Sequence, residues 1–283
     1  MDTIRIGGVP EHFNLPWHLT IEEGIYERNN IHLKWIDFPG GTGAMCEALR
    51  NKDIDIAIIL TEGIVKDIIM GNPSKIIQTY IQSPLIWGIH VAYNAKYKTI
   101  SDLENTSAAI SRYGSGSHLM AYINAQENGW NTSNLKFNVV KNLEGAIKSL
   151  EENSSDYFMW EHFTTKPLVD SKTFRRVADC PTPWPCFVIA VREEVLDTKS
   201  EQLQTILDII NNTTKDFKHI PSIDKTLSNR YQQKLEDIRE WLYLTEWSQS
   251  LITHKTLTNV QEQLFKLNII DRTIDTKKLV SEL

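Results

Sequence analysis

A glycine- and serine-rich turn, Arg112–His118 (RYGSGSH), lies between an apolar strand-like run, Ala108–Ile110, and a helix-like run, Leu119–Ile123. In a strand–turn–helix connection the N–H groups of the turn and of the first helical turn converge, and the helix dipole adds partial positive charge there. The hydroxyl groups of Ser115 and Ser117 add hydrogen-bond donors. The pattern therefore predicts an anion-binding loop. The alternative is an ordinary connection whose glycines serve the turn and whose serine caps the helix.

The N-terminal third of the chain alternates strand-like and helix-like patterns. The strand-like runs are Ile4–Val9, Ile31–Phe38, Ile54–Leu60, Lys75–Ile81 and Trp87–Tyr93, and the helix-like runs are Trp17–Arg28, Ala44–Asn51 and Glu62–Met70. The run Ile54–Leu60 is apolar almost throughout, as expected of a buried parallel strand. This repeated rhythm predicts an α/β fold with a mostly parallel sheet flanked by helices.

A second block begins near Asn94 and repeats the rhythm. Its strand-like runs are Ser107–Ile110, Lys136–Val140, Asp156–Met159, Phe174–Ala178 and Phe187–Val191, and its helix-like runs are Gly116–Asn128 and Leu143–Glu152. Proline cannot occupy the interior of a sheet, so the cluster Pro181, Pro183 and Pro185 predicts a crossover between two lobes. The helical remainder, Ser200–Leu283, is expected to pack on the first lobe. The predicted lobes are residues 1–92 plus 191–283 and residues 93–190.

Composition places the chain among ordinary globular proteins. It has 283 residues, 41% of them hydrophobic and 23% charged, and a net charge of −6 without a basic block. A general nucleic-acid surface or a stable membrane association is therefore not expected. No apolar run approaches the roughly 20 residues that span a bilayer. The N-terminal sequence resembles no secretory signal, so a cytoplasmic protein is expected. Three cysteines without a CxxC pair argue against a disulfide framework or a zinc site.

Ligands of open parallel sheets bind beyond the carboxyl ends of the strands. Five such loops carry glycine, hydroxyl, acidic or aromatic residues: Pro10–Phe13, Pro39–Gly43, Thr61–Gly63, Arg112–His118 and Trp160–His162. In Pro39–Gly43 a capping hydroxyl before a helix is expected, and Arg112 and His118 add possible positive charge. The predicted ligand-binding residues are Glu11, His12, Phe13, Gly40, Gly41, Thr42, Thr61, Glu62, Arg112, Tyr113, Gly114, Ser115, Gly116, Ser117, His118, Trp160 and Glu161.

Several kinds of chemistry are disfavoured by these loops. No Gly-Lys-Ser/Thr follows the glycines of Pro39–Gly43, and Leu119 replaces the third glycine of a dinucleotide fingerprint. A nucleophile elbow needs a glycine two residues before and two residues after the serine, and around Ser115 these positions are Tyr113 and Ser117. The histidines show no metal-binding pair on one helical face. We therefore predict no cofactor, no metal and no catalytic residue.

Carboxylates and aromatic rings accompany the predicted anion site. Glu11, Glu62 and Glu161 lie on the ligand-side loops, which suggests a ligand with a cationic or hydrogen-donating end. Aromatic walls for the body of such a ligand could come from Phe13, Trp17, Tyr113, Trp160 and Trp184. Each of these residues also has a plain structural reading, as a surface charge or a core aromatic.

The chain resembles the type II periplasmic-binding-protein superfamily, in its nitrate, sulfonate and taurine branch. The resemblance rests on Pro39–Gly43 followed by Asp53–Ala57 (DIDIA), on Tyr113–His118, and on Asp156–Glu161 (DYFMWE). Within that superfamily the chain looks most like the intracellular group typified by a Candida protein. The resemblance implies two α/β lobes joined by crossing strands, which close on a small molecule by hinge motion.

The expected function is binding of a small anionic or zwitterionic metabolite, such as a sulfonate, a phosphate or a thiamine precursor, in the cleft between the lobes. One alternative is a biosynthetic enzyme related to thiamine-pyrimidine synthesis, with His12, His118 or His162 moving protons. That family needs a lysine and a histidine near the end of the third strand, and Ile58–Gly63 contains neither. The other alternative is the substrate-binding component of an ABC transporter whose export signal has been removed.

Overall fold

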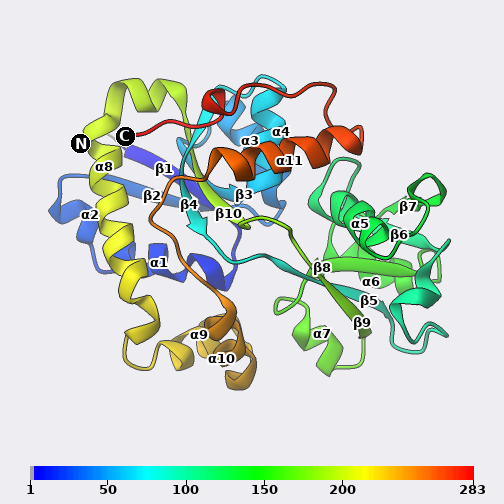
Figure 1. Ribbon diagram of the computed structural model, residues 1–283. Helices are drawn as coiled ribbons and strands as arrows, with labels where there is room; N and C mark the ends of the chain where they lie inside the picture. The colour runs from blue at the N-terminus through cyan, green and yellow to red at the C-terminus, as the bar shows by residue number, and fades with distance from the viewer. Residues whose placement is uncertain (1–2) are drawn as a thin grey trace. The chain divides into compact units, whose positions relative to one another are not determined.

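The computed structural model of the protein, which describes residues 3–283, divides into two compact units (Figure 1). Unit 1 comprises the chain up to Ser83 together with Trp184–Leu283, and unit 2 comprises Pro84–Pro183. Both boundaries lie several residues before the predicted ones at 92/93 and 190/191. The reason is strand pairing, because the run that follows Pro84 pairs within the sheet of unit 2, and the run that follows Trp184 pairs within the sheet of unit 1.

The sheet of unit 1 has five strands in the order β2-β1-β3-β10-β4. These are β1 (Thr3–Gly8), β2 (His32–Asp37), β3 (Ile56–Leu60), β4 (Ser74–Ile81) and β10 (Phe187–Arg192). Strand β1 pairs in parallel with β2 and β3, whereas β10 runs antiparallel to both β3 and β4. The sheet is therefore mixed, because the returning strand β10 is inserted among strands that share one direction.

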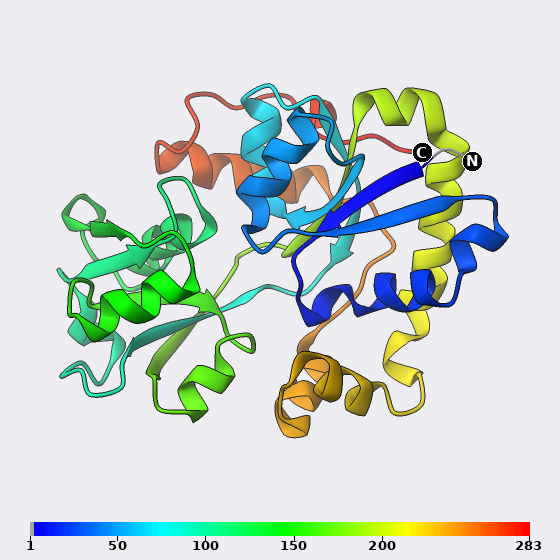
Figure 2. The ribbon, with the colours of Figure 1, turned by 180° about the vertical axis from the view of Figure 1, so that it is seen from behind.

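The helices of unit 1 cover its sheet in two groups (Figure 2). One group joins α1 to α8, and the other joins α3 and α4 to each other and α4 to α11. Their bounds are η1 (His12–Asn14), α1 (Leu15–Glu22), α2 (Ile25–Arg28), α3 (Gly41–Arg50), α4 (Thr61–Ile69), α8 (Glu193–Asp216), η4 (Phe217–His219), α9 (Ile223–Tyr231), α10 (Leu235–Leu244), α11 (His254–Lys266) and η5 (Thr276–Lys278). The C-terminal helices thus pack on the first unit, as their apolar periodicity predicts.

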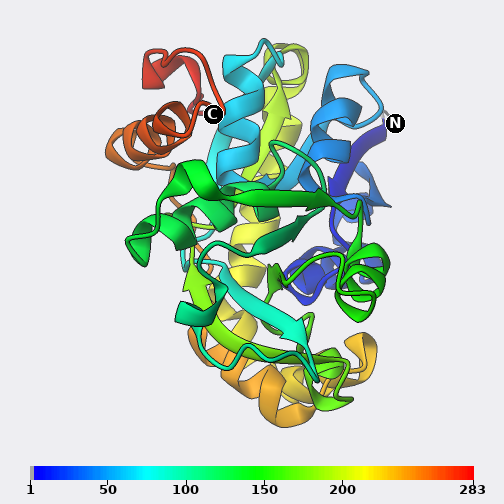
Figure 3. The ribbon, with the colours of Figure 1, turned by 90° about the vertical axis from the view of Figure 1, so that its right-hand side faces the viewer.

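Unit 2 repeats the strand order of unit 1, and its strands and helices are drawn in teal to green in Figure 3. Its strands are β5 (Ile86–Ala92), β6 (Ser107–Ile110), β7 (Lys136–Val139), β8 (Tyr157–Glu161) and β9 (Phe174–Pro181), in the order β7-β6-β8-β5-β9. Its helices are η2 (Ile100–Leu103), α5 (Gly116–Glu127), η3 (Thr132–Asn134), α6 (Leu143–Glu151) and α7 (Lys166–Asp170). Here β5 is the antiparallel strand, inserted between β8 and β9.

One aspartate in each unit secures equivalent strands. The carboxylate of Asp55, just before β3, accepts a hydrogen bond from the backbone N–H of Arg5 in β1 at 2.8 Å. The carboxylate of Asp156, just before β8, accepts one from the N–H of Ser107 in β6, also at 2.8 Å. Asp55 additionally binds the guanidinium groups of Arg5 and Arg192. Asp55, the second aspartate of the motif Asp53–Ala57, therefore has a structural role within the sheet.

Each unit has its own apolar core. In unit 2, Ala146 and Leu150 of α6 pack against Ala109, Phe158 and Phe174 of the sheet. In unit 1, the isoleucines of β3 and the apolar face of α4 are buried, and Trp17 is fully enclosed. Trp17 is therefore a core residue. No helix among the described residues is long and apolar enough to cross a membrane.

Candidate functional site

The loop between β6 and α5 has the geometry of a preformed anion cradle. Gly114 adopts a left-handed conformation with φ of 74°, which turns the chain toward the helix at little steric cost. Helix α5 begins at Gly116, and Ser115 is its N-cap residue. The N–H groups of Gly116 and Ser117 precede the first possible intrahelical acceptor, and no residue among 3–283 accepts from them. Two backbone donors at the positive end of a helix dipole are thus available.

The hydroxyl groups of this loop form a chain that fixes its shape. Ser115 Oγ accepts a hydrogen bond from the N–H of His118 at 3.4 Å and lies 3.1 Å from Ser117 Oγ. Ser117 Oγ in turn accepts a hydrogen bond from the N–H of Ser111 at 3.0 Å. Both serines are almost fully buried. Ser115 therefore does cap the helix, and the cap and the cradle are two aspects of one structure.

Of the charged and aromatic residues of the loop, two are exposed and one is buried. Arg112 is exposed, and Tyr113 is 65% exposed with its ring edge-on to His118. His118 is buried, and its Nδ1 accepts a hydrogen bond from the N–H of Gly114 at 3.1 Å. The backbone of the loop thus engages one ring nitrogen of His118, and Arg112 is the exposed cation of the loop.

The glycine-rich loop of unit 1 differs from the expected arrangement. Helix α3 begins at Gly41, its N-cap residue is Gly40, and no side chain caps it. The expected capping by the Thr42 hydroxyl is therefore wrong. Instead, the Thr42 methyl group packs against α4, and a Cβ atom on Gly63 would lie 2.1 Å from it. The helix can begin early because Gly41 adopts the left-handed conformation, with φ of 66°.

The segment after β1 is enclosed by aromatic rings from the C-terminal helices. His12 is 1% exposed, stacks on Phe13 and meets the ring of Trp241 edge-on at 4.4 Å. Burial lowers the pKa of His12 to about 3, so this imidazole is neutral at physiological pH. Its Nε2 and the Nε1 of Trp241 have no hydrogen-bond partner among the described residues. Glu11, next to them, is half-buried.

The segment after β3 carries a buried hydroxyl and a buried carboxyl group. Thr61 Oγ1 donates to the backbone carbonyl of Pro185 at 2.6 Å, which ties α4 to the chain before β10. Glu62 is 3% exposed, and its Oε2 accepts a hydrogen bond from Trp184 Nε1 at 2.9 Å. Burial raises the pKa of Glu62, because the charged form loses its hydration.

Trp160 and Glu161 lie at the end of β8 rather than in a loop. Trp160 stacks on Phe158, with ring centroids 5.4 Å apart, and borders the core of unit 2. Glu161 is 4% exposed, and its Oε2 accepts a hydrogen bond from the N–H of Thr164 at 2.6 Å. Burial raises the pKa of Glu161 as well. Both residues therefore have structural partners within unit 2.

Topology places the predicted residues at one edge in each sheet. Strands β1, β2 and β3 are parallel, so the residues that follow them share the carboxyl edge of the sheet of unit 1, where β10 starts. The residues after β6 and the end of β8 share the corresponding edge in unit 2. Three residues near these edges were not predicted from the sequence: Ser111, Trp241 and Asn142. Asn142 follows β7 and is the N-cap residue of α6, with its side chain accepting a hydrogen bond from the N–H of Gly145. An asparagine at the start of a helical pattern is a helix-start signal, so Asn142 could have been predicted.

The histidines offered for proton transfer have other roles. In His162, Nδ1 lies 2.8 Å from Asp179 Oδ1, and Nε2 is bonded to Arg176. Both ring nitrogens of His162 are thus engaged. His12 is neutral, and His118 accepts through Nδ1. None of the three is arranged as a positioned general base with an activated nucleophile beside it.

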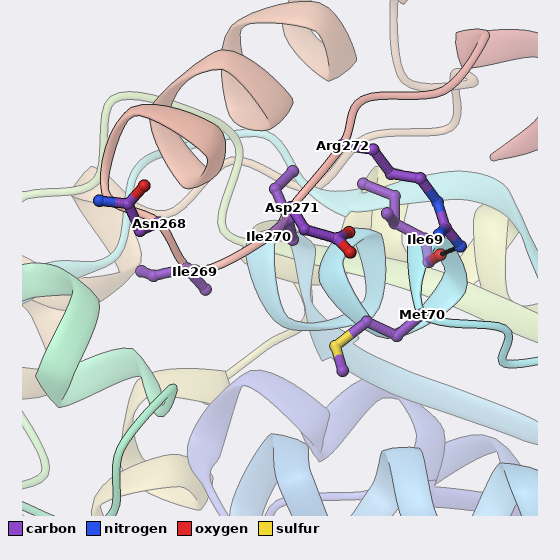
Figure 4. A pocket seen from close by; sticks show the side chains of 7 residues that line it. All are labelled: Ile69, Met70, Asn268, Ile269, Ile270, Asp271 and Arg272. Atoms are coloured by element: carbon purple, nitrogen blue, oxygen red, sulfur yellow. Dashed lines mark hydrogen bonds between the residues drawn. The ribbon is translucent and has the colours of Figure 1, made fainter.

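A surface pocket of about 520 Å³ lies elsewhere on unit 1 (Figure 4). It is lined by Ile69 and Met70 at the end of α4 and by the segment Asn268–Arg272. Helix α4 starts at Thr61 and ends at Ile69, so this pocket is roughly 12 Å from Glu62 along the helix. It contains none of the predicted site residues. Within residues 3–283, no group of three His, Cys, Asp or Glu side chains could hold a metal ion.

Comparison with known proteins agrees with this architecture. Residues 87–180 match the family described as Ca3427-like PBP. The Candida albicans CA3427 gene product, which is described as exhibiting the generic periplasmic binding protein fold, superposes with a TM-score of 0.90 at 25% identity, over 100% of this chain and 97% of that one. No curated protein matches the sequence.

Two bacterial binding proteins show the same fold at lower identity. The alkanesulfonate-binding protein SsuA from Xanthomonas axonopodis pv. citri, bound to MOPS, has a TM-score of 0.83 at 14% identity, over 99% of this chain and 98% of that one. The periplasmic nitrate-binding protein NrtA from Synechocystis has a TM-score of 0.73 at 14% identity, over 97% and 84%. The predicted resemblance to type II periplasmic-binding-protein-like chains, and to the Candida-type group among them, is confirmed.

Proposed function

We propose that this chain, which has the periplasmic-binding-protein fold, binds a small anionic or zwitterionic molecule at the Arg112–His118 loop and acts by binding alone. The observation that carries the proposal is the pair of unused N–H groups at Gly116 and Ser117. They lie at the start of a twelve-residue helix, in a loop whose shape is held by its own hydroxyl groups. Such a loop needs no reorganisation to receive a sulfonate, phosphate or similar oxyanion.

Because the chain carries a net negative charge, binding of an anion has to depend on hydrogen-bond donors close to it. The net charge is −6, so long-range attraction works against an anion, and short-range donors must decide binding. Among similar structures, those named for sulfonate and nitrate binding support an anion as the ligand class. An oxyanion such as a sulfonate or a phosphate is the ligand class in this proposal. A cytoplasmic location is also part of it, and cell fractionation tests that location directly.

The Ser115→Ala substitution is the first test. We expect it to weaken binding of an alkanesulfonate such as ethanesulfonate about fivefold to tenfold, because one hydrogen bond near an ionised group contributes roughly 1 kcal/mol or more. It also lowers the free energy of unfolding by about 0.5–2 kcal/mol through loss of the cap. Isothermal titration calorimetry measures the first effect and urea unfolding the second.

Thr253→Ala is the matched control. Thr253 is exposed and caps α11 through the N–H of Thr256, so its loss costs similar stability without touching the loop. It should leave affinity unchanged. If Ser115→Ala behaves in the same way, the Ser115 hydroxyl group only caps the helix, and the proposal then depends on the N–H groups of Gly116 and Ser117 alone. Native mass spectrometry of the protein from its own cells would then be the route to its ligand.

A further inference from the structure

The turn that follows β8 is held by the guanidinium group of Arg176. Arg176 lies on β9, and its Nη2 donates to the backbone carbonyl of His162 at 2.6 Å. Its Nη1 lies 2.5 Å from His162 Nε2, and its Nε donates to His90 Nε2 of β5 at 3.4 Å. One side chain thus joins β9 to β5 and to the segment His162–Thr165, which leads from β8 into α7 and is called the β8–α7 turn below.

This geometry fixes the proton positions of His162. A guanidinium group has only donors, so a ring nitrogen that it contacts has to accept. In this arrangement Nε2 of His162 accepts, and the single proton of the neutral ring lies on Nδ1, which is 2.8 Å from Asp179 Oδ1. The same rule applies to His90, whose Nε2 accepts from Arg176. Each imidazole can serve the guanidinium group as an acceptor only while it is neutral.

The two histidines differ in their access to water. His90 is fully buried, and burial lowers its pKa to about 3, so it remains neutral under mildly acidic conditions. The side chain of His162 is 16% exposed and lies in a turn. Histidine is the side chain whose charge ordinarily changes between about pH 5 and 8. The acceptor of Arg176 that a proton from solvent can reach is therefore His162.

The other charged groups near His162 do not replace its bond to the guanidinium group. Asp179 attracts a protonated ring, but it already binds Nδ1, and its side chain is 38% exposed, so water screens its charge. Burial raises the pKa of the neighbouring Glu161, so its protonation in mild acid favours the buried state and opposes an opening of the turn. On α7, Lys166 and Asp170 bind each other at 2.6 Å. The contact with the guanidinium group therefore decides the response to acid.

We propose that the β8–α7 turn is an acid-released latch: protonation of His162 breaks its bond to Arg176 and frees the turn from β9. A proton on Nε2 places donor against donor and cation against cation, so the ring and the guanidinium group have to separate. The backbone carbonyl of His162 loses the same group, because one side chain holds both. The turn also covers Glu161 through the N–H of Thr164, so its release uncovers the end of β8. This device lies within unit 2 and does not depend on the proposed function.

Nitrogen NMR of the histidine rings in the ligand-free protein reads the proton positions directly. At about pH 7.5 we expect His162 to carry its proton on Nδ1 and none on Nε2. At about pH 5.5 both nitrogens of this ring should be protonated, while His90 stays neutral. A proton on Nε2 of His162 at pH 7.5 would contradict the bond to Arg176 and overturn the proposal.

Hydrogen exchange of the backbone amides measures the release itself. Between about pH 7.5 and pH 5.5, after correction for the intrinsic exchange rates, the protection of the Thr164 and Thr165 amides should fall about tenfold, within the limit of about tenfold per pH unit for one linked proton. The amides of α6 in the same unit should keep their protection. An unchanged turn would mean that nothing is released, and an equal loss across unit 2 would mean acid unfolding of the unit. Either result would overturn the proposal.

Substitutions at the two partners separate the latch from other effects of acid. Glutamine at position 162 can accept from Arg176 and donate to Asp179, but it does not titrate. The His162→Gln variant should therefore keep the turn protected at both pH values. Arg176→Gln removes the guanidinium group and should leave the turn unprotected at both. If either variant retains the acid response of the wild type, the proton acts elsewhere and the proposal fails.

Two further variants are matched controls. Glu161→Gln removes the neighbouring carboxylate but keeps an oxygen that can accept from the turn, so the tenfold loss of protection should persist. His254→Gln alters an exposed histidine of unit 1, whose Nδ1 lies 2.8 Å from Thr276 Oγ1, and it should leave the acid response unchanged. A response abolished by Glu161→Gln would assign the switch to that carboxylate and overturn the role of His162.

Discussion

Replacing Asp55 with asparagine is expected to lower the free energy of unfolding by roughly 3–5 kcal/mol, as for other broken buried ion pairs. Asp55 binds the backbone N–H of Arg5 and the guanidinium groups of Arg5 and Arg192, at 2.7 to 3.1 Å. The Arg192 side chain is 8% exposed, so the substitution leaves a buried cation without its main partner. Arg5 is 34% exposed and can turn toward water. The measurement is urea unfolding at pH 7.

Asp53 provides the matched control, because it is an exposed aspartate two residues earlier on the same segment. Asp53→Asn should change the free energy of unfolding by less than about 0.5 kcal/mol, as surface substitutions usually do. An equal effect of the two substitutions would contradict the assignment of Asp55 as the residue that joins β1, β3 and β10.

The loss should also depend on pH in a defined direction. Burial raises the pKa of Asp55, but the hydrogen bonds from Arg5 and Arg192 outweigh it, so that the pKa lies below its ordinary value of 3.8. Asp55 therefore contributes stability that is fully present above pH 3.8 and is lost as pH falls through the folded pKa. The difference between wild type and Asp55→Asn should be constant from pH 7 to pH 5 and shrink below pH 3.8. If the difference in free energy of unfolding grew as the pH fell below 3.8, the pKa of Asp55 would be raised in the folded protein and not lowered.

Replacing Gly116 with proline is expected to weaken oxyanion binding roughly 10- to 100-fold while preserving the fold. Gly116 occupies the first helical position of α5, where proline is well tolerated because its missing N–H has no intrahelical acceptor. Ser115 has φ of −81° and ψ of 169°, which is the conformation a residue before proline prefers. The substitution thus removes one anion donor, and a hydrogen bond to a charged group contributes roughly 1.5–3 kcal/mol.

Gly116→Ala distinguishes lost hydrogen bonding from steric obstruction. Alanine adds a Cβ atom but keeps the N–H group, so it should retain most of the affinity for ethanesulfonate or methylphosphonate in calorimetry. Thermal unfolding should show both variants at or above the stability of the wild type, because both residues lower the conformational entropy of the unfolded chain. Undiminished binding by the proline variant would remove the Gly116 N–H from the site.

The strands and helices were predictable because burial patterns are local. The apolar run Ile54–Leu60 and the alternation around it predict β3 and its neighbours, and the structure has them nearly residue for residue. The two lobe boundaries were less accurate, because the partner of β5 or β10 depends on pairing with strands far along the chain. The start of α3 was also misplaced, since the freedom of Gly41 allowed a helix where the glycines suggested a loop.

The sequence predicted at which edge of each sheet the candidate site residues lie, but not the hydrogen-bond and aromatic partners of those residues. The order of strands and loops placed Glu62, Glu161 and Ser115 at sheet edges, because parallel strands all end on one side. Nothing local distinguishes Glu62 from Glu161, or predicts that His118 accepts a hydrogen bond from the chain four residues before it. The aromatic partner of His12, Trp241, comes from a helix that carries no loop signal.

By itself, the sequence determined the α/β class, the repeated order of elements and the edges at which ligand-side residues gather. Hydrophobic periodicity and glycine positions suffice for this, because each acts within a few residues of the chain. Only the tertiary structure decided which polar atoms are satisfied and which are left free. The hydrogen bond from Trp184 to Glu62 joins residues 122 apart, and that from Arg192 to Asp55 joins residues 137 apart. A hydrogen bond depends on where its partner lies in space, and that placement follows from the packing of the whole unit.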